Sequence, residues 1–168
     1  NEETNDWSDL MELTDILTNT PISDLPARLE PVLDVESGLR FLAILSLFSS
    51  LDSYIGNARN YYLYDRDDTG QFTLLLWDAN LAFGSFRMIL EPSENPATLD
   101  PFPPSSMRTG FGQPGSGTSS DLTLIKNMLA VESYNRTYLS VMAQMLREGF
   151  NYSSVNARVQ ELAGVIRT

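Results

Sequence analysis

The sequence contains no cysteine, no histidine and only one lysine, Lys126. Without cysteine there are no disulfides, thiolate metal ligands or cysteine nucleophiles. Without histidine there is no serine–histidine triad, no histidine zinc site and no histidine general base. Any chemistry that this chain performs must therefore use carboxylates, amides, hydroxyls, arginines or Lys126, and carboxylates are abundant.

Basic residues are scarce: 11 Lys and Arg stand against 22 Asp and Glu, which gives a formal net charge of −11. Such a surface repels phosphate backbones and anionic lipid heads, so it argues against nucleic-acid and membrane-surface partners and favours cations. No run of ~18 apolar residues is present, so we expect no membrane span. The acidic, thiol-free composition favours a secreted or cell-surface protein, and a chain that begins with Asn1 reads as a mature or excised piece.

A chain of 168 residues is expected to form one domain, residues 1–168. Apolar residues at three- and four-residue steps predict a first helix at 5–19. A nearly continuous apolar run after Asp34 predicts a central buried helix that reaches Leu51. Strand-forming residues on either side of a turn predict a β-hairpin. The expected strands are 61–64 and 72–77, followed by a long Pro-, Gly- and Ser-rich loop at 92–120 and helices at 122–131, 132–149 and 153–167. This order predicts a mainly helical α+β fold.

The turn of the predicted hairpin carries a possible calcium motif. Asp65, Asp67 and Thr69 alternate before Gly70, as in the first half of an EF-hand loop. The acid that closes such a loop belongs at position twelve, where this chain has Leu76, and the flanking segments are strands rather than helices. The sequence therefore favours the alternative, an acidic hairpin tip in which Gly70 adopts a positive φ.

Two polar residues follow the predicted central helix at a spacing used by protein kinases. Asp52 is followed five residues later by Asn57, as the catalytic-loop Asp and Asn are in kinases. There the Asp accepts the proton of the attacking hydroxyl and the Asn holds a magnesium ion. The alternative is that Asp52 only caps a helix end or a turn, since this spacing is common.

Asp78 comes at the end of the second predicted strand, shortly before the pair Phe83-Gly84. An acid fixed by an apolar strand end is suited to hold a phosphate-bridging magnesium ion. The alternative is an ordinary strand-end turn. The order of the parts favours the first interpretation: buried helix, Asp-x4-Asn, hairpin, Asp, Phe-Gly, long loop and helices is the order in the larger lobe of a protein kinase.

These residues resemble the CotH kinase family, the spore coat protein H group of atypical protein kinases. The resemblance rests on the runs 51–64, 69–72 and 77–84, and it implies a kinase-like C-terminal lobe that transfers the γ-phosphoryl group of ATP to Ser or Thr of a protein substrate with Mg²⁺ or Mn²⁺. It implies that Asp52 is the catalytic aspartate, that Asn60 is the asparagine of an Asn-Tyr-Tyr motif, and that Asp78 is the metal-binding acid of a Trp-Asp motif. Asn80 is then a supporting ligand, and either Asn57 or Asn60 holds the metal. A secreted, cell-surface or spore-coat location follows from the same resemblance.

The chain departs from the kinase pattern in three respects. Arg59 precedes Asn60 where His is expected in many relatives. No lysine precedes Asp52, although kinases use one to hold the α- and β-phosphates, and neither Arg28 nor Arg40 is an obvious replacement. The small lobe is missing as well, so the chain is interpreted as the C-terminal half of a family member. The alternative function is a non-catalytic, kinase-like scaffold for adhesion or assembly.

Overall fold

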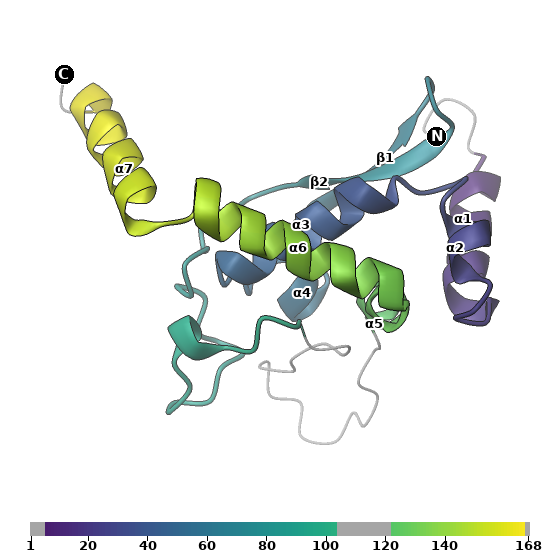
Figure 1. The fold of residues 1–168 in the computed structure, drawn as a ribbon, viewed down its shortest axis with the longest axis horizontal. Coiled ribbons are helices and arrows are strands. Elements are labelled where there is room, and N and C mark those ends of the chain that lie inside the picture. Colours follow the sequence, from purple (N-terminus) through teal and green to yellow (C-terminus); the bar gives the residue numbers. More distant parts are fainter. Residues whose placement is uncertain (1–5, 104–121, 167–168) are drawn as a thin grey trace.

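The computed structural model describes residues 6–103 and 122–166, and its fold is mainly helical α+β, as predicted (Figure 1). The elements in chain order are α1 (Ser8–Asn19), α2 (Leu25–Leu29), α3 (Val35–Leu47), α4 (Tyr54–Asn57), β1 (Tyr61–Arg66), β2 (Gln71–Leu76), the 3₁₀ turn η1 (Pro96–Thr98), α5 (Thr123–Ala130), α6 (Glu132–Glu148) and α7 (Tyr152–Ile166). Within the described residues, no helix has both the length and the apolar character needed to cross a membrane.

Helix α3 is the centre of the hydrophobic core, with α6 packed across it (Figure 1). The helix begins after Asp34, which caps its N-terminus: Asp34 Oδ1 accepts a hydrogen bond from the Ser37 N–H at 3.0 Å. It ends at Leu47, four residues earlier than the sequence predicts, because Ser49 adopts a left-handed conformation with φ 44°. Continuous apolar composition therefore identified the buried helix but did not reveal where it ends.

The hairpin is antiparallel, and its register places Leu63 opposite Leu74. Phe72 and Leu74 are buried against the core, as the alternation of a half-buried strand requires. The backbone of Phe72 also exchanges hydrogen bonds with the chain just before α3, donating to the Val32 carbonyl at 2.8 Å and accepting from the Asp34 N–H at 2.9 Å. These bonds fix the hairpin beside the N-terminus of α3.

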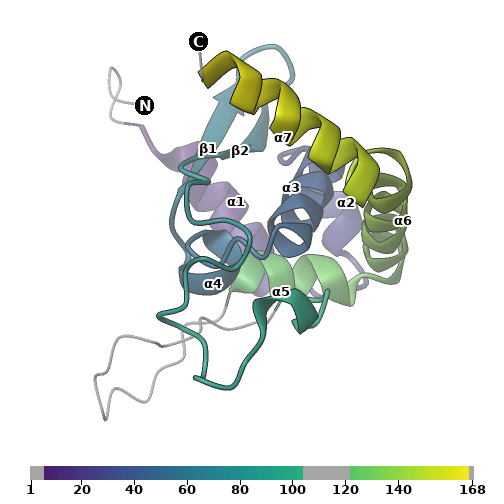
Figure 2. The same cartoon turned by 90° about the vertical axis from the view of Figure 1, so that its left-hand side faces the viewer.

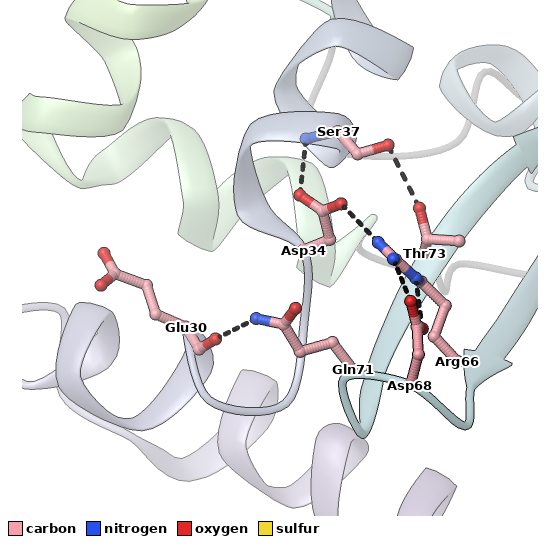
Figure 3. Close-up of polar contacts among 7 residues, drawn as sticks. All are labelled: Glu30, Asp34, Ser37, Arg66, Asp68, Gln71 and Thr73. Carbon is pink, nitrogen blue, oxygen red and sulfur yellow. Dashed lines mark hydrogen bonds and ion pairs between the residues drawn. The ribbon is translucent and has the colours of Figure 1, made fainter.

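Polar side chains reinforce the same junction (Figure 3). The guanidinium of Arg66 lies 2.8 Å from the carboxylate of Asp68 and 3.7 Å from that of Asp34. Thr73 Oγ1 donates to Ser37 Oγ at 3.1 Å, which joins β2 to the first turn of α3. Gln71 Nε2 donates to the carbonyl of Glu30 at 2.8 Å. The tip of the hairpin is therefore held to the rest of the fold at several points.

The terminal helices agree with the expected segments to within about two residues, whereas α2 was not predicted. Helix α6 buries four side chains, while α7 has no buried residue; it lies at one end of the molecule in Figure 1 and faces the viewer in Figure 2. Part of the predicted loop at 92–120 is described: residues 92–103 contain only η1 as regular structure. The rest of that predicted loop, 104–120, lies outside the described residues.

Candidate functional site

The chain leaves α3 through a tightly packed turn that ends in α4. Ser53 is almost fully buried, and its hydroxyl donates to the carbonyl of Ser50. Gly56 is tightly enclosed because a Cβ at this position would lie 1.9 Å from the carbonyl oxygen of Leu51. Only glycine allows this approach, so the segment between Leu51 and Asn57 is a compact turn.

The turn brings together three of the residues that the sequence singles out. Asn57 Nδ2 donates to Oδ1 of Asp52 at 3.0 Å. Asn60 Nδ2 lies 3.2 Å from Oδ2 of the same carboxylate and 2.7 Å from the Asp52 carbonyl. Both carboxylate oxygens are thus held by side-chain amides. Asp52 does not cap α4, because the N-cap residue of that helix is Ser53.

The amide of Asn57 leaves one oxygen without a partner. Its nitrogen faces Asp52, and its Oδ1 is buried with no hydrogen bond to any described residue. An unsatisfied buried acceptor costs about 1–3 kcal/mol, so such atoms are rare in folded proteins. A hard cation such as Mg²⁺ prefers carboxylate and amide oxygens, and bound here it would satisfy this atom. The donor set therefore fits a divalent metal.

Asp78 enters the same neighbourhood from the hairpin. The Trp77 N–H donates to the carbonyl of Asn60 at 3.3 Å, which places the residue after Trp77 beside the Asp52 turn. Asp78 itself has φ 45° and is exposed, as is Asn80. Neither side chain has a hydrogen-bond or ion-pair partner among residues 6–103 and 122–166. Both are therefore accessible to a ligand rather than engaged within the fold.

The Phe-Gly pair fastens the segment after β2 to the exit of α3. Phe83 N–H donates to the Phe48 carbonyl at 2.5 Å, and Gly84 N–H donates to the Ser49 carbonyl at 3.1 Å. The rings of Phe48 and Phe83 pack edge to face with centroids 5.0 Å apart. Gly84 has φ 67°, and a Cβ there would lie 2.1 Å from Cβ of Pro96. The segment that carries Asp78 is thus anchored by the hairpin before it and by this contact after it.

Left-handed backbone conformations are concentrated in this part of the chain. The non-glycine residues with positive φ in the described structure are Ser49, Ala58, Asn60, Asp78 and Phe83. Such conformations cost roughly 1–2 kcal/mol for most residues, and Asn and Asp tolerate them best. Strained positions of this kind cluster at functional sites, which supports a site here.

The acidic residues at the hairpin tip lie in and beside a turn between two strands, and Arg66 pairs with one of them. Asp65 lies within β1 opposite Phe72, and the carboxylate of Asp68 is bound by Arg66, which lowers its pKa. Burial and the nearby carboxyl of Asp9 raise the pKa of Asp65. Gly70 has the positive φ that an acidic tip requires, 66°. Among the described residues, no three His, Cys, Asp or Glu side chains gather closely enough to hold a metal, so a metal at the candidate site would depend on amide oxygens as well as on acids.

The structural roles of Gly56 and Tyr54 were not predicted. The Tyr54 ring packs edge to face on Tyr61 at 5.0 Å, and burial raises the pKa of its hydroxyl. A glycine inside a short helical turn is itself a signal of close packing, and this signal was available for Gly56. The contact of Tyr54 with β1 depends on tertiary structure and carries no local signal.

A comparison with known proteins identifies the family of this chain. The family model described as CotH kinase protein matches residues 1–168, the whole chain. The chain therefore belongs to the CotH kinase family. A search of curated proteins finds no match.

Proposed function

We propose that this chain takes part in the metal-dependent transfer of the γ-phosphoryl group of ATP to Ser or Thr of a protein substrate, and that it is the C-terminal part of the catalytic fold. The observation that carries this proposal is the clamping of the Asp52 carboxylate by Asn57 and Asn60. A carboxylate held on both oxygens is suited to orient a reacting group. Family membership supports the same reaction class.

Asp52 is the residue that we assign to the acceptor hydroxyl. During transfer, a bond forms between the hydroxyl oxygen and the γ-phosphorus, the bond from that phosphorus to the ADP oxygen breaks, and the hydroxyl proton passes to the Asp52 carboxylate. The two amide bonds keep this carboxylate in one orientation. Positioning of this kind is most of what phosphoryl transfer needs from a protein.

Asp78 and Asn57 are the residues that we assign to Mg²⁺ or Mn²⁺, with Asn60 and Asn80 in supporting roles. The buried, unpaired Oδ1 of Asn57 supports its choice as a ligand, whereas the Asn60 nitrogen is already committed to Asp52. The exposure of Asp78 allows it to reach a metal or a phosphate group. When bound, the cation neutralises charge on the triphosphate.

The net charge of −11 supports a metal-dependent reaction, because it repels anionic ligands that carry no cation. An ATP tail meets strong repulsion from this many carboxylates unless a cation lies between them. The same charge argues against nucleic-acid partners. We assign the protein to a secreted, cell-surface or spore-coat location, which membership of the CotH kinase family supports.

A scaffold for adhesion or assembly is the second candidate function, and the exposed apolar side chains of α7 favour it. Tyr152 is 87% exposed and Ile166 is 84% exposed, so this helix presents apolar surface to solvent. Such surface often marks contacts with other proteins. A scaffold needs neither the clamped carboxylate nor the unpaired amide oxygen, so tests at Asp52 and Asp78 separate the two functions.

The direct test is transfer of labelled phosphate from ATP, in the presence of Mn²⁺, to a casein-like acceptor by the full-length protein. Asp78→Ala and Asp52→Asn are expected to lower transfer at least about 100-fold, because the first removes a proposed metal ligand and the second removes the proposed proton acceptor. Asp67→Asn is the matched control: it removes the same charge from the exposed tip of the hairpin, so its transfer rate should equal that of the wild type.

Thermal unfolding of all variants shows whether the fold is retained. Transfer at the wild-type rate by Asp78→Ala would contradict the metal assignment. Wild-type transfer by Asp52→Asn would contradict the assignment of the catalytic carboxylate. If the full-length wild type transfers no phosphate to any acceptor, including itself, the scaffold function replaces the kinase function.

A further inference from the structure

Arg59 lies in the chain between Asn57 and Asn60, the two residues that hold the Asp52 carboxylate. It separates Ala58 from Asn60, which have left-handed φ angles of 55° and 56°, and its own side chain is exposed. Asn60 is fixed by its side-chain bonds to Asp52 and by the hydrogen bond that its carbonyl accepts from Trp77. The backbone that carries Arg59 is therefore held on both sides, because the Ala58 N–H also donates to the Tyr54 carbonyl at 3.3 Å.

Arg59 forms no ion pair or hydrogen bond with the described part of the chain. Other arginines are engaged: Arg40 lies 2.8 Å from Glu36, Arg66 lies 2.8 Å from Asp68, and Arg158 lies 2.7 Å from Glu161. The side chains of Arg28 and Arg147 also form no ion pair or hydrogen bond with the described residues, so Arg59 is distinguished by its place between Asn57 and Asn60 rather than by its lack of a partner. An unpaired arginine between the candidate catalytic residues is available for an external anion.

Between Arg40 and Arg87 the sequence contains two basic residues, Arg59 and Arg66, and Arg66 lies near the hairpin tip. Arg40 is tied to Glu36 on α3, and Arg87 donates to the carbonyl of Glu94 at 2.9 Å. Lys126 belongs to α5. Among the segments that form the candidate site, Arg59 thus supplies the cationic side chain.

The geometry points to Arg59 as the residue that binds the phosphate chain of the nucleotide, in the role that a lysine has in other kinases. This inference rests on the proposed function, because it takes ATP as the ligand. A guanidinium donates two parallel hydrogen bonds to phosphate oxygens, and it retains its charge beside other groups. It would act together with the divalent cation to offset repulsion between the triphosphate and the carboxylates of Asp52 and Asp78.

The inference can be tested by equilibrium binding of ATP, ADP and AMP, each with Mn²⁺, to the full-length protein. Arg59→Gln is expected to weaken ATP and ADP binding roughly tenfold or more and to change AMP binding little, because it removes charged hydrogen bonds to the phosphate chain. Arg59→Lys should restore part of the loss. The matched control is Arg147→Gln, which makes the same change in net charge at an exposed position in the last turn of α6.

The results of these binding measurements have distinct consequences for the role assigned to Arg59. Equal ATP affinities for the wild type and Arg59→Gln would overturn the assignment while leaving the kinase function intact. Equal losses in Arg59→Gln and Arg147→Gln would reduce the effect to overall charge and would also overturn it. An unchanged ATP affinity with a raised KM for an acidic acceptor protein would assign Arg59 to the protein substrate instead. Failure of the wild type to bind any of the three nucleotides would overturn the proposed function and this inference together.

Discussion

The segment 48–84 and helix α7 differ strongly in how closely the surrounding residues hold their backbone in place. In the first region, side-chain amides hold Asp52, the Phe83 backbone is bonded to Phe48, and Gly56 packs against a backbone carbonyl. In α7 no residue is buried, and Gly164 has no atom within 4 Å of the position of a Cβ. The first region is fixed by side-chain and backbone contacts, one of which joins residues 35 positions apart in the sequence, whereas α7 is held mainly by its own helical hydrogen bonds.

The two regions differ in what determines their backbone conformation: intrinsic helix propensity in α7, and contacts with surrounding residues in 48–84. Helix α7 forms because its residues favour a helix, so substitutions there should follow intrinsic propensities. The 48–84 region keeps left-handed residues that local preferences oppose, and such conformations persist only where surrounding contacts require them. The same substitution should therefore have opposite effects in the two regions.

Replacement of Gly56 by alanine should have the largest effect. The added Cβ would approach the Leu51 carbonyl oxygen to 1.9 Å, so the backbone must move, and we expect a loss of about 3 kcal/mol in the free energy of unfolding. Urea denaturation measures this loss. Gly164→Ala in α7 is the matched control, because it meets no atom within 4 Å and should leave stability unchanged or raise it by up to about 1 kcal/mol. Similar losses for both variants would contradict the contrast between the regions.

The second prediction concerns stability at alkaline pH. Burial, followed by the influence of Tyr61, raises the pKa of Tyr54 above its usual value of 10.0. The folded state therefore keeps a proton that the unfolded state loses, so the stability from Tyr54 is complete below pH 10 and falls as the pH rises further. The expected slope is about 1.4 kcal/mol per pH unit for each such tyrosine.

Urea denaturation between pH 9 and 11 tests this slope. Tyr54→Phe cannot ionise, so its stability should fall less steeply above about pH 10 than that of the wild type. Burial also raises the pKa values of Tyr134 and Tyr138, so part of the slope should remain. Tyr152→Phe, in the exposed first turn of α7, is the control and should keep the full slope. An identical slope for Tyr54→Phe and the wild type would show that Tyr54 is not protected from ionisation.

The elements of the fold were largely predictable because periodicity and turn chemistry are local signals. The central helix, the hairpin and the helices near the C-terminus all follow from such patterns. The end of α3 was not predicted, because it is accompanied by a contact between residues far apart in the sequence. Ser49 is left-handed, and its carbonyl accepts a hydrogen bond from the N–H of Gly84, 35 residues away. The unpredicted α2 has only five residues, too few for a clear periodic signal.

The candidate site was predictable to a similar degree. Asp52 and Asn57 are close in sequence, so their spacing alone indicated that they could face one cleft. The contact between Trp77 and Asn60 continues the hairpin register, which was not predicted from the sequence. The unpaired oxygen of Asn57 and the free state of Arg59 depend on every nearby side chain, so no local pattern could reveal them.

The smallest predicted effect compares one substitution at two alanines. Ala58 is left-handed, with φ 55° and ψ 42°, so Ala58→Gly should relieve strain and raise the free energy of unfolding by about 0.5–1 kcal/mol, after allowance for the greater freedom of glycine in the unfolded chain. Ala157 lies inside α7, so Ala157→Gly should lower helix stability by about 1 kcal/mol. Urea denaturation reports the first change and far-UV circular dichroism reports the second. Loss of stability in Ala58→Gly would mean that the packing contacts of the Ala58 methyl group outweigh the backbone strain. The turn that carries Asn57 and Arg59 would then be stabilised at Ala58 by side-chain packing, despite the unfavourable φ.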